Sequence, residues 1–518
     1  MTSNSRLRLL LFRGLALGLM NTETINTEVL VIGAGPAGAS AAFHAASAGW
    51  DVMVVDMFDM LASPRDKTCG DGLTPRAVGA LEAMGAGHLL DGHPEIRGLK
   101  LHGFGGSITA PWPAHSRFPQ RGSAIPRSDF DSRLLGFAVD AGARFIGGMK
   151  AVDVSSCGRR VICRPNIKDA NQPNLEIHTR FLILAEGVRS MIARKLGVQW
   201  LRGLVHGIAA RSYVESTRAD EPWIHSHVEL RDSDGVAQPG YGWVFPLGAP
   251  TAGGLAGDGV AGDGVADDGP AGDGVADDQV GAGGAASTPP PTDNTTTAQP
   301  HTDNSLLTPA PTPVGQVNLG CGALATSERP AKVNTKKLLV QYANSVRDDW
   351  DLGEPQRITS ALLPMGGAVT RVAGRNWAAI GDTAALVNPL NGEGIDYGIE
   401  SARLVVDLLS DAARNPDGLT HMWPARLREE YGDAFALARR LGMLLTMPGL
   451  MAAIGPVGMS GPLASTVMNS AARLMGNLVT PEDKDLTARL WLGAGKLSRG
   501  VDRLFAADSR PLFGATMR

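Results

Sequence analysis

The stretch Glu28-Val29-Leu30-Val31-Ile32-Gly33-Ala34-Gly35-Pro36-Ala37-Gly38 decides the fold of this chain of 518 residues. An apolar run enters a G-x-G-x-x-G turn, a small-residue helix follows, and a second apolar run, Val52 to Val55, ends at Asp56. Gly33 allows the tight turn, Gly35 lets backbone approach a pyrophosphate, and Gly38 lets the helix pack on the strand. The helix N-terminus, at Ala37, offers N–H groups to the anion, and Asp56 can bind a ribose hydroxyl. The stretch therefore predicts a dinucleotide-binding domain.

Three later motifs indicate which dinucleotide is bound. Phe181–Gly187 reads as a strand ending in a turn, Trp377–Ala384 closes on Gly381-Asp382, and Asn391-Gly-Glu-Gly394-Ile395 follows. Taken alone, Gly381-Asp382 fits a helix N-cap. The series, however, resembles the flavoprotein monooxygenase and reductase superfamily, which implies an extended FAD. That resemblance implies that Asp382 holds the ribityl chain and that Gly394 and Ile395 present N–H groups to the flavin ring, where they can stabilise charge.

Two further motifs narrow the family. They are Arg65-Asp-Lys-Thr-Cys69-Gly70-Asp-Gly72-Leu-Thr-Pro-Arg76 and Pro239-Gly-Tyr241-Gly-Trp243-Val-Phe245-Pro-Leu247. With Ile208–Tyr213 they resemble the geranylgeranyl reductase family, and within it the actinobacterial menaquinone reductase type, over residues 27–248 and 315–440. The resemblance implies an FAD enzyme that saturates double bonds in polyprenyl chains, with Tyr241, Trp243 and Phe245 lining the lipid site. Alternation alone would also place these rings on one face of an ordinary strand.

The same resemblance implies further cofactor contacts. Cys69, Gly70 and Gly72 would lie beside the flavin, Arg127 would contact FAD from the start of an amphipathic helix, and the backbone at Ala151 would pass the cofactor. Reduced flavin would give hydride to one alkene carbon, and Cys69, a water or the flavin itself would supply the proton. Cys69 also fits a small buried thiol. Glu186 and Arg189 depart from the family pattern and leave the second FAD contact open.

The fold class that follows is α/β (α+β), with a Rossmann-like FAD-binding domain of the p-hydroxybenzoate hydroxylase type, an inserted antiparallel-sheet substrate domain and a helical C-terminal region. Residues 1–26 are interpreted as a disordered or interfacial extension, because the apolar run there is too short to span a bilayer. The expected boundaries are 27–98, 121–200 and 355–410 for the FAD domain, 99–120 and 201–354 for the substrate domain, and 411–518 for the helical region.

One segment inside the substrate domain differs in composition. Residues 250–314 repeat Gly-Asp-Gly-Val-Ala and continue into a Thr/Pro/Asn tract, with nine Asp and no Lys or Arg. Such a segment cannot build a core, so we expect a disordered expansion of a hairpin loop.

The sequence predicts no metal site. The five-residue period of the insertion matches neither calcium motif, and the spacing of the four cysteines fits no zinc site. Nothing suggests a disulfide framework, which favours the cytoplasm.

Composition also bears on partners. Removing the nine aspartates from a formal charge of −4 leaves +5 for the other residues, which suits an anionic membrane surface. Leu441–Ala472 holds no charged residue but is interrupted by Pro and Gly, which predicts short broken helices that cover a lipid or touch a leaflet, with Arg439, Arg440 and Arg473 as anchors. We expect a cytoplasmic enzyme associated peripherally with the inner face of the membrane, and no nucleic-acid partner.

Several alternatives stay open at this point. The substrate can be menaquinone, or geranylgeranyl diphosphate or a geranylgeranyl lipid. The same scaffold hosts aromatic monooxygenases, and a non-catalytic FAD-binding membrane protein is a further reading. No second G-x-G-x-x-G follows a strand, so electrons would come from an external reductase, NAD(P)H or a quinol.

Overall fold

The quoted stretch forms the centre of a parallel sheet. The computed structural model describes residues 22–166, 172–201, 204–249, 314–331, 333–447, 449–460, 464–483, 485–505 and 512–514. Strand β1 (Thr22–Ile32) pairs in parallel with β2 (Val52–Val55) on one side and with β11 (Asn174–Leu184) on the other. The parallel pairing continues outward to β8 (Arg144–Ile146) and β18 (Trp377–Ala379), and β17 (Ala373–Gly374) joins antiparallel. Val29–Ile32 is buried throughout, as a strand covered on both faces requires.

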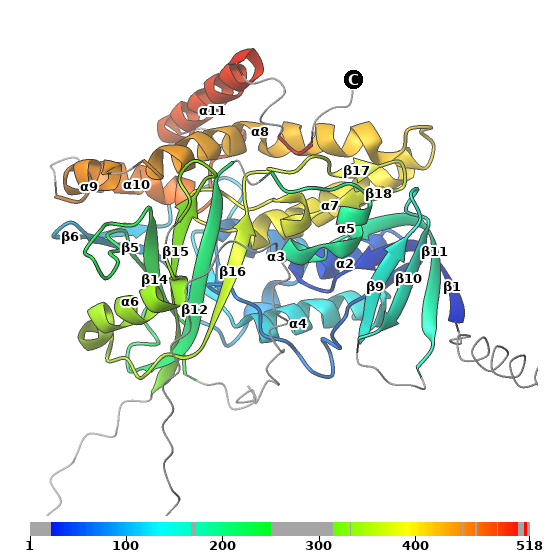
Figure 1. Ribbon diagram of the computed structural model, residues 1–518, viewed down its shortest axis with the longest axis horizontal. Helices are drawn as coiled ribbons and strands as arrows, with labels where there is room; N and C mark the ends of the chain where they lie inside the picture. Colours follow the sequence, from blue (N-terminus) through cyan, green and yellow to red (C-terminus); the bar gives the residue numbers. More distant parts are fainter. Residues whose placement is uncertain are drawn as a thin grey trace, which may run out of the picture. The chain divides into compact units, whose positions relative to one another are not determined.

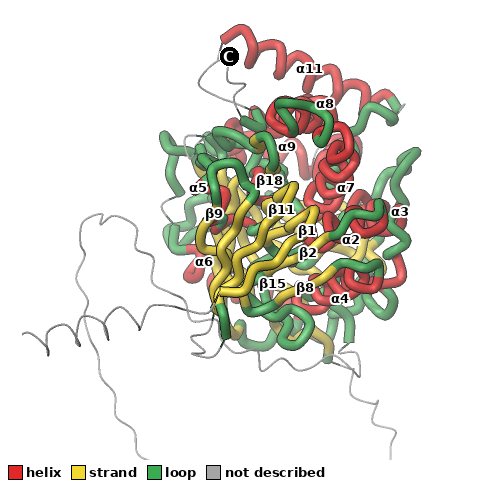
Figure 2. Tube along the Cα trace, turned by 90° about the vertical axis from the view of Figure 1, so that its right-hand side faces the viewer, coloured by secondary structure: helices red, strands yellow, loops and turns green. Residues whose placement is uncertain are grey.

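Helices and a small antiparallel extension cover the two faces of this sheet. In Figure 2, β1, β2 and β11 lie between α2 (Pro36–Ser47) and α4 (Arg127–Asp140) on one side and β9 (Met149–Val154) and α5 (Met191–Lys195) on the other. Strand β10 (Arg160–Pro165) joins β9 to β11. Helix α7 (Ile395–Ala412) packs on α2, where Gly398 meets Ala37.

A second sheet of seven strands contains the aromatic strand of the sequence analysis. Its order is β16-β12-β15-β14-β13-β5-β6, and its neighbours are antiparallel except the parallel pair β13–β5. Helix α6 (Thr335–Trp350) lies beside this sheet in Figure 1. Its Leu339, Tyr342 and Trp350 pack in one apolar cluster with residues of β12, β14 and β15. The strands are β5 (Gly98–Gly103), β6 (Gly106–Pro111), β12 (His206–Ser216), β13 (Trp223–His227), β14 (Gly240–Pro246), β15 (Gly315–Ala325) and β16 (Gln356–Pro364).

The remaining elements join the sheets and end the chain. A small sheet pairs β7 (Gly122–Ala124) with β3 (Gly72–Leu73) and β4 (Glu95–Ile96), next to α3 (Pro75–Ala83) and η1 (Gly87–Leu90). The C-terminal helices run along the top of Figure 1: α8 (Leu419–Leu445), α9 (Leu450–Ser460), α10 (Ala464–Met475) and α11 (Leu486–Phe505). The broken helices expected after Leu441 are thus confirmed. Across the described residues, none of the helices combines the length and the apolar character that crossing a bilayer requires.

The predicted fold class is confirmed, whereas the domain boundaries remain predictions. Two details differ from the expected ranges. Strand β1 begins at Thr22, so residues 22–26 belong to a strand and not to the N-terminal extension. Strand β16 begins at Gln356 and pairs with β12 in the second sheet, although its residues fall in the range expected for the FAD domain. Residues 1–21 and 250–313 lie outside the described residues.

The segment 250–314 is inserted between two strands that pair with each other, as expected. Strands β14 and β15 run antiparallel, with Pro246 opposite Val317 and Gly240 opposite Ala323. Further bonds close the pair beyond the strand ends, from Leu247 N–H to the Gln316 carbonyl and from Gln316 N–H to the Gly248 carbonyl, at 3.0 and 3.1 Å. The register is therefore set by residues on both sides of the insertion.

Deleting Ala256 to Pro313 and joining the flanks by a short Gly/Asn turn is expected to preserve folding and FAD content, because the hairpin register does not depend on the deleted residues. Thermal melting and flavin absorbance of the purified proteins measure this. Loss of the bound flavin on deletion would show that the segment packs on the enzyme, and stabilisation of the intact chain by calcium would revive the metal-array reading.

Candidate active site

The first glycine motif contains two glycines that the neighbouring backbone requires and one, Gly35, that it does not. Gly33 has φ +103° and a Cβ there would overlap the Ala185 carbonyl, while a Cβ at Gly38 would overlap the Gly33 carbonyl. Glycine is therefore required at both positions, because the neighbouring backbone leaves no room for a Cβ atom. A Cβ at Gly35 would meet only Asp131 Oδ2 at 3.8 Å and Arg127 Nη2 at 3.9 Å, which is ordinary contact. No described residue comes closer to that Cβ position, so a close-fitting ligand group explains the glycine there.

This space lies at the start of α2. Gly35 is the N-cap, no side chain caps the helix, and Pro36 occupies the first turn. The N–H groups of Ala37 and Gly38 are thus left for an anion, as at other nucleotide-binding helix N-termini. The arrangement fits the pyrophosphate of FAD.

Asp56 and Ala151 lie at the end of the site where the adenosine half would lie. Asp56 Oδ2 accepts the Ala34 N–H at 2.8 Å and Oδ1 accepts the Phe58 N–H at 2.9 Å, so the carboxylate fixes the glycine turn while each oxygen keeps a lone pair. The Met149 N–H binds the Asp56 carbonyl at 2.9 Å, which brings the start of β9, and with it Ala151, to this point. The proposed ribose contact stays a prediction.

The third motif packs directly on the first. Gly381 has φ +54° and a Cβ there would press on the Ala37 side chain. It opens the short helix η3 (Gly381–Ala384), in which Thr383 accepts the Gly187 N–H at 3.0 Å. The N-terminus of α7 follows, and a Cβ at Gly394 would lie 3.3 Å from Asp382 Oδ1. Asp382, Gly394 and Ile395 are thus brought together at one side of the α2 N-terminus.

Asp382 has a partner that the sequence did not reveal. Lys67 Nζ donates to Asp382 Oδ2 at 3.1 Å across a sequence separation of 315 residues. Although burial acts to raise the pKa of Asp382, the charge and hydrogen bond of Lys67 outweigh it and hold that pKa below its usual value. The carboxylate is therefore ionised and can accept hydroxyl groups of a ribityl chain.

Residues 65–72 form a loop that is clamped by the second sheet. Arg211 on β12 binds Asp66 and donates to the Lys67 carbonyl at 3.1 Å. Tyr213 donates to Asp71 Oδ2 at 2.7 Å. These two residues belong to the Ile208–Tyr213 motif, and their contacts hold the loop against the sheet.

Asn318 on β15 completes the clamp and links it to the aromatic strand. Its amide donates to the Cys69 carbonyl at 2.7 Å and to Asp71 Oδ2 at 2.8 Å, and its oxygen accepts the Trp243 indole N–H at 3.0 Å. Burial raises the pKa of Asp71 to about 6, against the opposing effects of Arg211, Tyr213 and Asn318. One buried amide therefore fixes both the Cys69 loop and Trp243.

Arg127 and Cys69 face the same region. Arg127 is buried and donates from Nε and Nη2 to Asp131, both at 2.7 Å, within the amphipathic helix α4 that the sequence predicted. Cys69 is half-buried, and burial raises the pKa of its thiol although the charge of Arg127 opposes this. The thiol is consequently protonated at neutral pH.

The three aromatic side chains of β14 lie on one face, as predicted. Ring centroids are 5.9 Å apart for Tyr241 and Trp243 and 6.1 Å apart for Trp243 and Phe245. Phe245 lies against the loop, where a Cβ at Gly70 or Gly72 would press on its ring. Tyr241 Oη donates to the Asn391 carbonyl at 2.6 Å and so reaches the glycine-rich turn before α7. Trp243 is nearly buried, and Tyr241 and Phe245 are half-buried.

The predicted site residues therefore form two connected groups. Gly33, Gly35, Ala37, Gly38, Asp382, Gly394 and Ile395 meet at the α2 N-terminus, with Arg127 beside Gly35 and with Asp56 and Ala151 at the other end of the turn. Cys69, Gly70 and Gly72 lie against the β14 face of Tyr241, Trp243 and Phe245. Their individual roles remain predictions.

Sequence reasoning missed Lys67, Asp71, Arg211, Tyr213 and Asn318 as site residues. Four of them lie in motifs quoted for the family resemblance, but Asn318 sits in an ordinary apolar strand without a signal. Glu186, the departure from the family pattern, accepts N–H groups of Met191, Ile192 and Ala193 and the Ser190 hydroxyl, so it caps α5. Its carboxylate is therefore already engaged by hydrogen bonds from Ser190 and α5.

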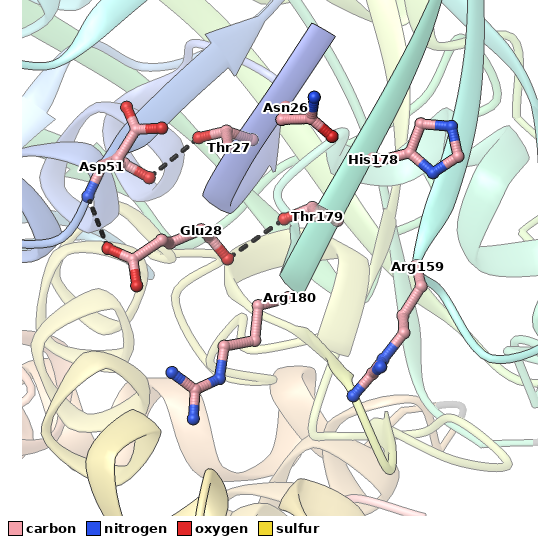
Figure 3. A pocket seen from close by; sticks show the side chains of 8 residues that line it. All are labelled: Asn26, Thr27, Glu28, Asp51, Arg159, His178, Thr179 and Arg180. Carbon is pink, nitrogen blue, oxygen red and sulfur yellow. Dashed lines mark hydrogen bonds between the residues drawn. The ribbon is translucent and has the colours of Figure 1, made fainter.

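A shallow surface hollow lies near the opposite end of β1. Figure 3 shows Thr27, Glu28, Asp51 and Thr179 joined by hydrogen bonds, whereas Arg159 and Arg180 point away from them. Thr27 Oγ1 donates to the Asp51 carbonyl at 2.8 Å and Thr179 Oγ1 to the Glu28 carbonyl at 3.1 Å. These groups pair among themselves and lie away from the glycine motif, so the hollow is not part of the cofactor site.

Comparison with known proteins agrees with the site. Residues 26–247 match a family model described as an FAD binding domain. The chain is 42% identical over 479 residues to the menaquinone reductase of Mycobacterium tuberculosis, spanning 92% of this chain and 98% of that protein. Its identity to the menaquinone reductase of Mycolicibacterium smegmatis is 42% over 485 residues, spanning 93% and 99%. A geranylgeranyl bacteriochlorophyll reductase-like protein from Thermoplasma acidophilum has a TM-score of 0.59 at 16% identity, spanning 92% and 98%.

The glycine cradle, the ionised Asp382 and the domain match define an FAD-dependent oxidoreductase, and the structural likeness confirms the fold of the p-hydroxybenzoate hydroxylase type. Within that class, the chain belongs to the menaquinone reductase family. The predicted cofactor, FAD, is thereby confirmed.

The contrast between the glycines gives a matched pair of variants. Gly35→Ala is expected to leave the melting temperature nearly unchanged and to weaken FAD binding at least about tenfold, because the methyl group occupies the ligand's space and touches no backbone. Gly38→Ala is expected to abolish soluble expression, because backbone must move. Calorimetry and flavin fluorescence measure both effects. If Gly35→Ala binds FAD as the wild type does, the pyrophosphate does not lie at this turn.

Proposed function

We propose that this enzyme reduces one carbon–carbon double bond in the polyprenyl side chain of menaquinone. The proposal rests on the junction between the aromatic face of β14 and the Cys69 loop, where Asn318 ties Trp243 to the loop beside the cofactor site. An apolar strand face held next to FAD suits a long apolar substrate, since each buried methylene contributes about 0.8 kcal/mol. The choice of menaquinone as the polyprenyl substrate rests on the names of the two mycobacterial relatives.

The cations around the site argue against a diphosphate head group. Lys67 pairs with Asp382, Arg127 with Asp131 and Arg211 with Asp66. These three charges are thus already engaged by carboxylates of the protein, whereas Arg65, at the start of the loop, lies over the Phe58 ring. Geranylgeranyl diphosphate is therefore the less favoured substrate, and a geranylgeranyl lipid is the runner-up to menaquinone.

Bound FAD supplies the hydride when reduced. The protein's part is to hold the alkene against the aromatic face, to exclude water with Trp243 and Phe245, and to provide a proton. Since an isolated alkene accepts hydride poorly, positioning by the clamped loop carries much of the task. We assign FAD binding to the glycine motif, Asp56, Arg127, Ala151, Asp382, Gly394 and Ile395, and substrate contact to Tyr241, Trp243 and Phe245. The Ile395 N–H that was expected to face the flavin donates to Glu393 Oε1 at 3.2 Å, so Gly394 is the better candidate for the N–H contact to the ring.

We further propose that the enzyme works at the inner face of the cell membrane and receives electrons from an external reductase, NAD(P)H or a quinol. Leu444, Met447, Ile454 and Val467 are exposed apolar side chains on and between α8, α9 and α10 and give a surface suited to lipid. Two of the three expected arginine anchors do not contribute: Arg439 is buried and binds the Gly366 carbonyl, and Arg473 is buried and binds Asp483 and Asp485. Arg440 is half-buried and donates to the Ser498 carbonyl at 3.1 Å.

Mass spectrometry tests the substrate. Purified enzyme with an artificial two-electron donor and menaquinone is expected to yield a quinone heavier by two hydrogen atoms after the head group has been re-oxidised in air. Re-oxidation removes any contribution from the head group, so the gain reports the chain alone. Hydroxylated product with oxygen uptake would identify a monooxygenase, and saturation of geranylgeranyl lipid but not menaquinone would select the runner-up.

Cys69→Ser is expected to lower the rate of chain saturation about tenfold or more, because the thiol lies in the loop that Asn318 ties to Trp243. FAD affinity is expected to stay intact, because the serine hydroxyl can still accept the Asp71 N–H that the Cys69 sulfur accepts at 3.4 Å, and the Cys69 carbonyl keeps its bond to Asn318. Cys157→Ser is the matched control, since Cys157 is exposed on the surface. Single-turnover product yield and flavin fluorescence measure the two quantities. Equal rates for both variants would return Cys69 to a structural role.

A further inference from the structure

Glu393 is an acidic side chain that the assignments above leave unused. It stands between Gly392 and Gly394 in the turn that precedes α7. Its N–H donates to Asn391 Oδ1 at 2.9 Å, its carbonyl accepts the Asn388 N–H at 2.8 Å, and its carboxyl Oε1 accepts the Ile395 N–H at 3.2 Å. The position of the carboxyl is therefore set by its own turn.

The same turn is fixed from two other parts of the fold. Tyr241 on the aromatic strand donates to the Asn391 carbonyl at 2.6 Å, and the Asn391 amide donates to the Met475 carbonyl at 2.6 Å. Glu393 consequently lies where the substrate strand meets the N-terminus of α7, beside Gly394, which neighbours Asp382. The residue as a whole is half-buried.

The electrostatic surroundings keep a proton on this carboxyl. The groups that act on it are Asp396 on α7, Arg127 on α4, the Cys69 thiol and the Tyr241 hydroxyl. Burial, and then the charge of Asp396, raise the pKa of Glu393 well above its usual value, and the hydrogen bonds from the Ile395 and Asp396 N–H groups and the charge of Arg127 only partly oppose them. A protonated carboxylic acid at neutral pH is a competent general acid.

The neighbouring groups are poorer donors. Asp71 is fully buried and cannot reach a ligand, while Asp382 is ionised against Lys67. The hydroxyl protons of Tyr213 and Tyr241 are engaged by Asp71 and the Asn391 carbonyl, and burial raises the pKa of Tyr241 further. The Cys69 thiol, whose pKa burial raises from a higher starting value, is a weaker acid than a carboxyl.

We propose that Glu393 is the catalytic acid of the proposed double-bond reduction, on which this inference rests. Two electrons and one hydrogen leave the reduced flavin as hydride and bond to one alkene carbon. The Glu393 O–H bond breaks and its proton bonds to the other carbon, so the π bond becomes two C–H bonds. The flavin is left oxidised and the carboxylate is reprotonated from water. A two-electron donor such as a nicotinamide or quinol then restores the flavin.

The test compares the wild type with Glu393→Gln, which keeps the shape and the acceptor for Ile395 N–H but has no acidic proton. Each FAD-loaded protein is reduced, mixed anaerobically with menaquinone, and analysed by mass spectrometry after re-oxidation of the head group. Reoxidation of the flavin by ferricyanide, which needs no proton on carbon, is measured in parallel. Glu429→Gln is the matched control, because Glu429 is exposed on α8.

We expect Glu393→Gln to lose about 100-fold or more in chain saturation while FAD affinity and the ferricyanide rate stay at wild-type values. Glu393→Asp should recover part of the rate. In the wild type the saturation rate should fall as pH rises through the raised pKa of Glu393, because the acid loses its proton. Infrared difference spectra at neutral pH should show a protonated-carboxyl band that Glu393→Gln lacks.

Two results overturn the inference in distinguishable ways. Wild-type chain saturation by Glu393→Gln, or absence of the carboxyl band, would remove Glu393 as the acid and leave the proposed function standing. If the wild type saturates no polyprenyl chain although its flavin is reduced and reoxidised by ferricyanide, the proposed function fails and the catalytic acid fails with it.

Discussion

The structure depends on direct backbone contact around Gly33 and Gly38, where no side chain can fit between the segments. Strand β1, the turn at Gly33, the end of β11 at Ala185 and the first turn of α2 are so close that a Cβ at Gly33 or Gly38 has no room. Because α2 is seated this deeply, Ala37 can contact both Gly381 and Gly398. The close packing of α2 on β1 therefore also sets the positions of Gly381 and of the N-terminal turn of α7.

A second constraint joins the two sheets. The loop 65–72 belongs to neither sheet, and its position comes from polar side chains of β12 and β15. Asn318 is central, because it is buried and satisfies the Cys69 carbonyl, Asp71 and the Trp243 indole at once. Buried polar groups require such partners, so shifting the strand would leave several of them unpaired. The position of the loop 65–72 relative to β14 is thus fixed by one side chain, Asn318.

The sequence predicts those parts of the fold that local patterns specify. The glycine motif, the helix starting at Arg127, the hairpin around the insertion and the broken C-terminal helices follow from spacing, periodicity and breaker residues, and the structure confirms them. Contacts between distant segments cannot be read in this way. Lys67 meets Asp382 and Asn318 meets Cys69 only because the fold brings separate segments together. Arg439 and Arg473 show the converse, since their flanking positions suggested exposed anchors whereas tertiary partners bury them.

The hairpin of β14 and β15 has a consequence for how such a chain can change over time. Strand β14 ends at Pro246, β15 begins at Gly315, and the two strands pair directly with each other. This pairing aligns the aromatic face of β14 with Asn318 on β15 without using residues of the connection. We therefore expect sequence changes in this connection, and domains inserted into it, to leave the contact between the aromatic face and Asn318 in place.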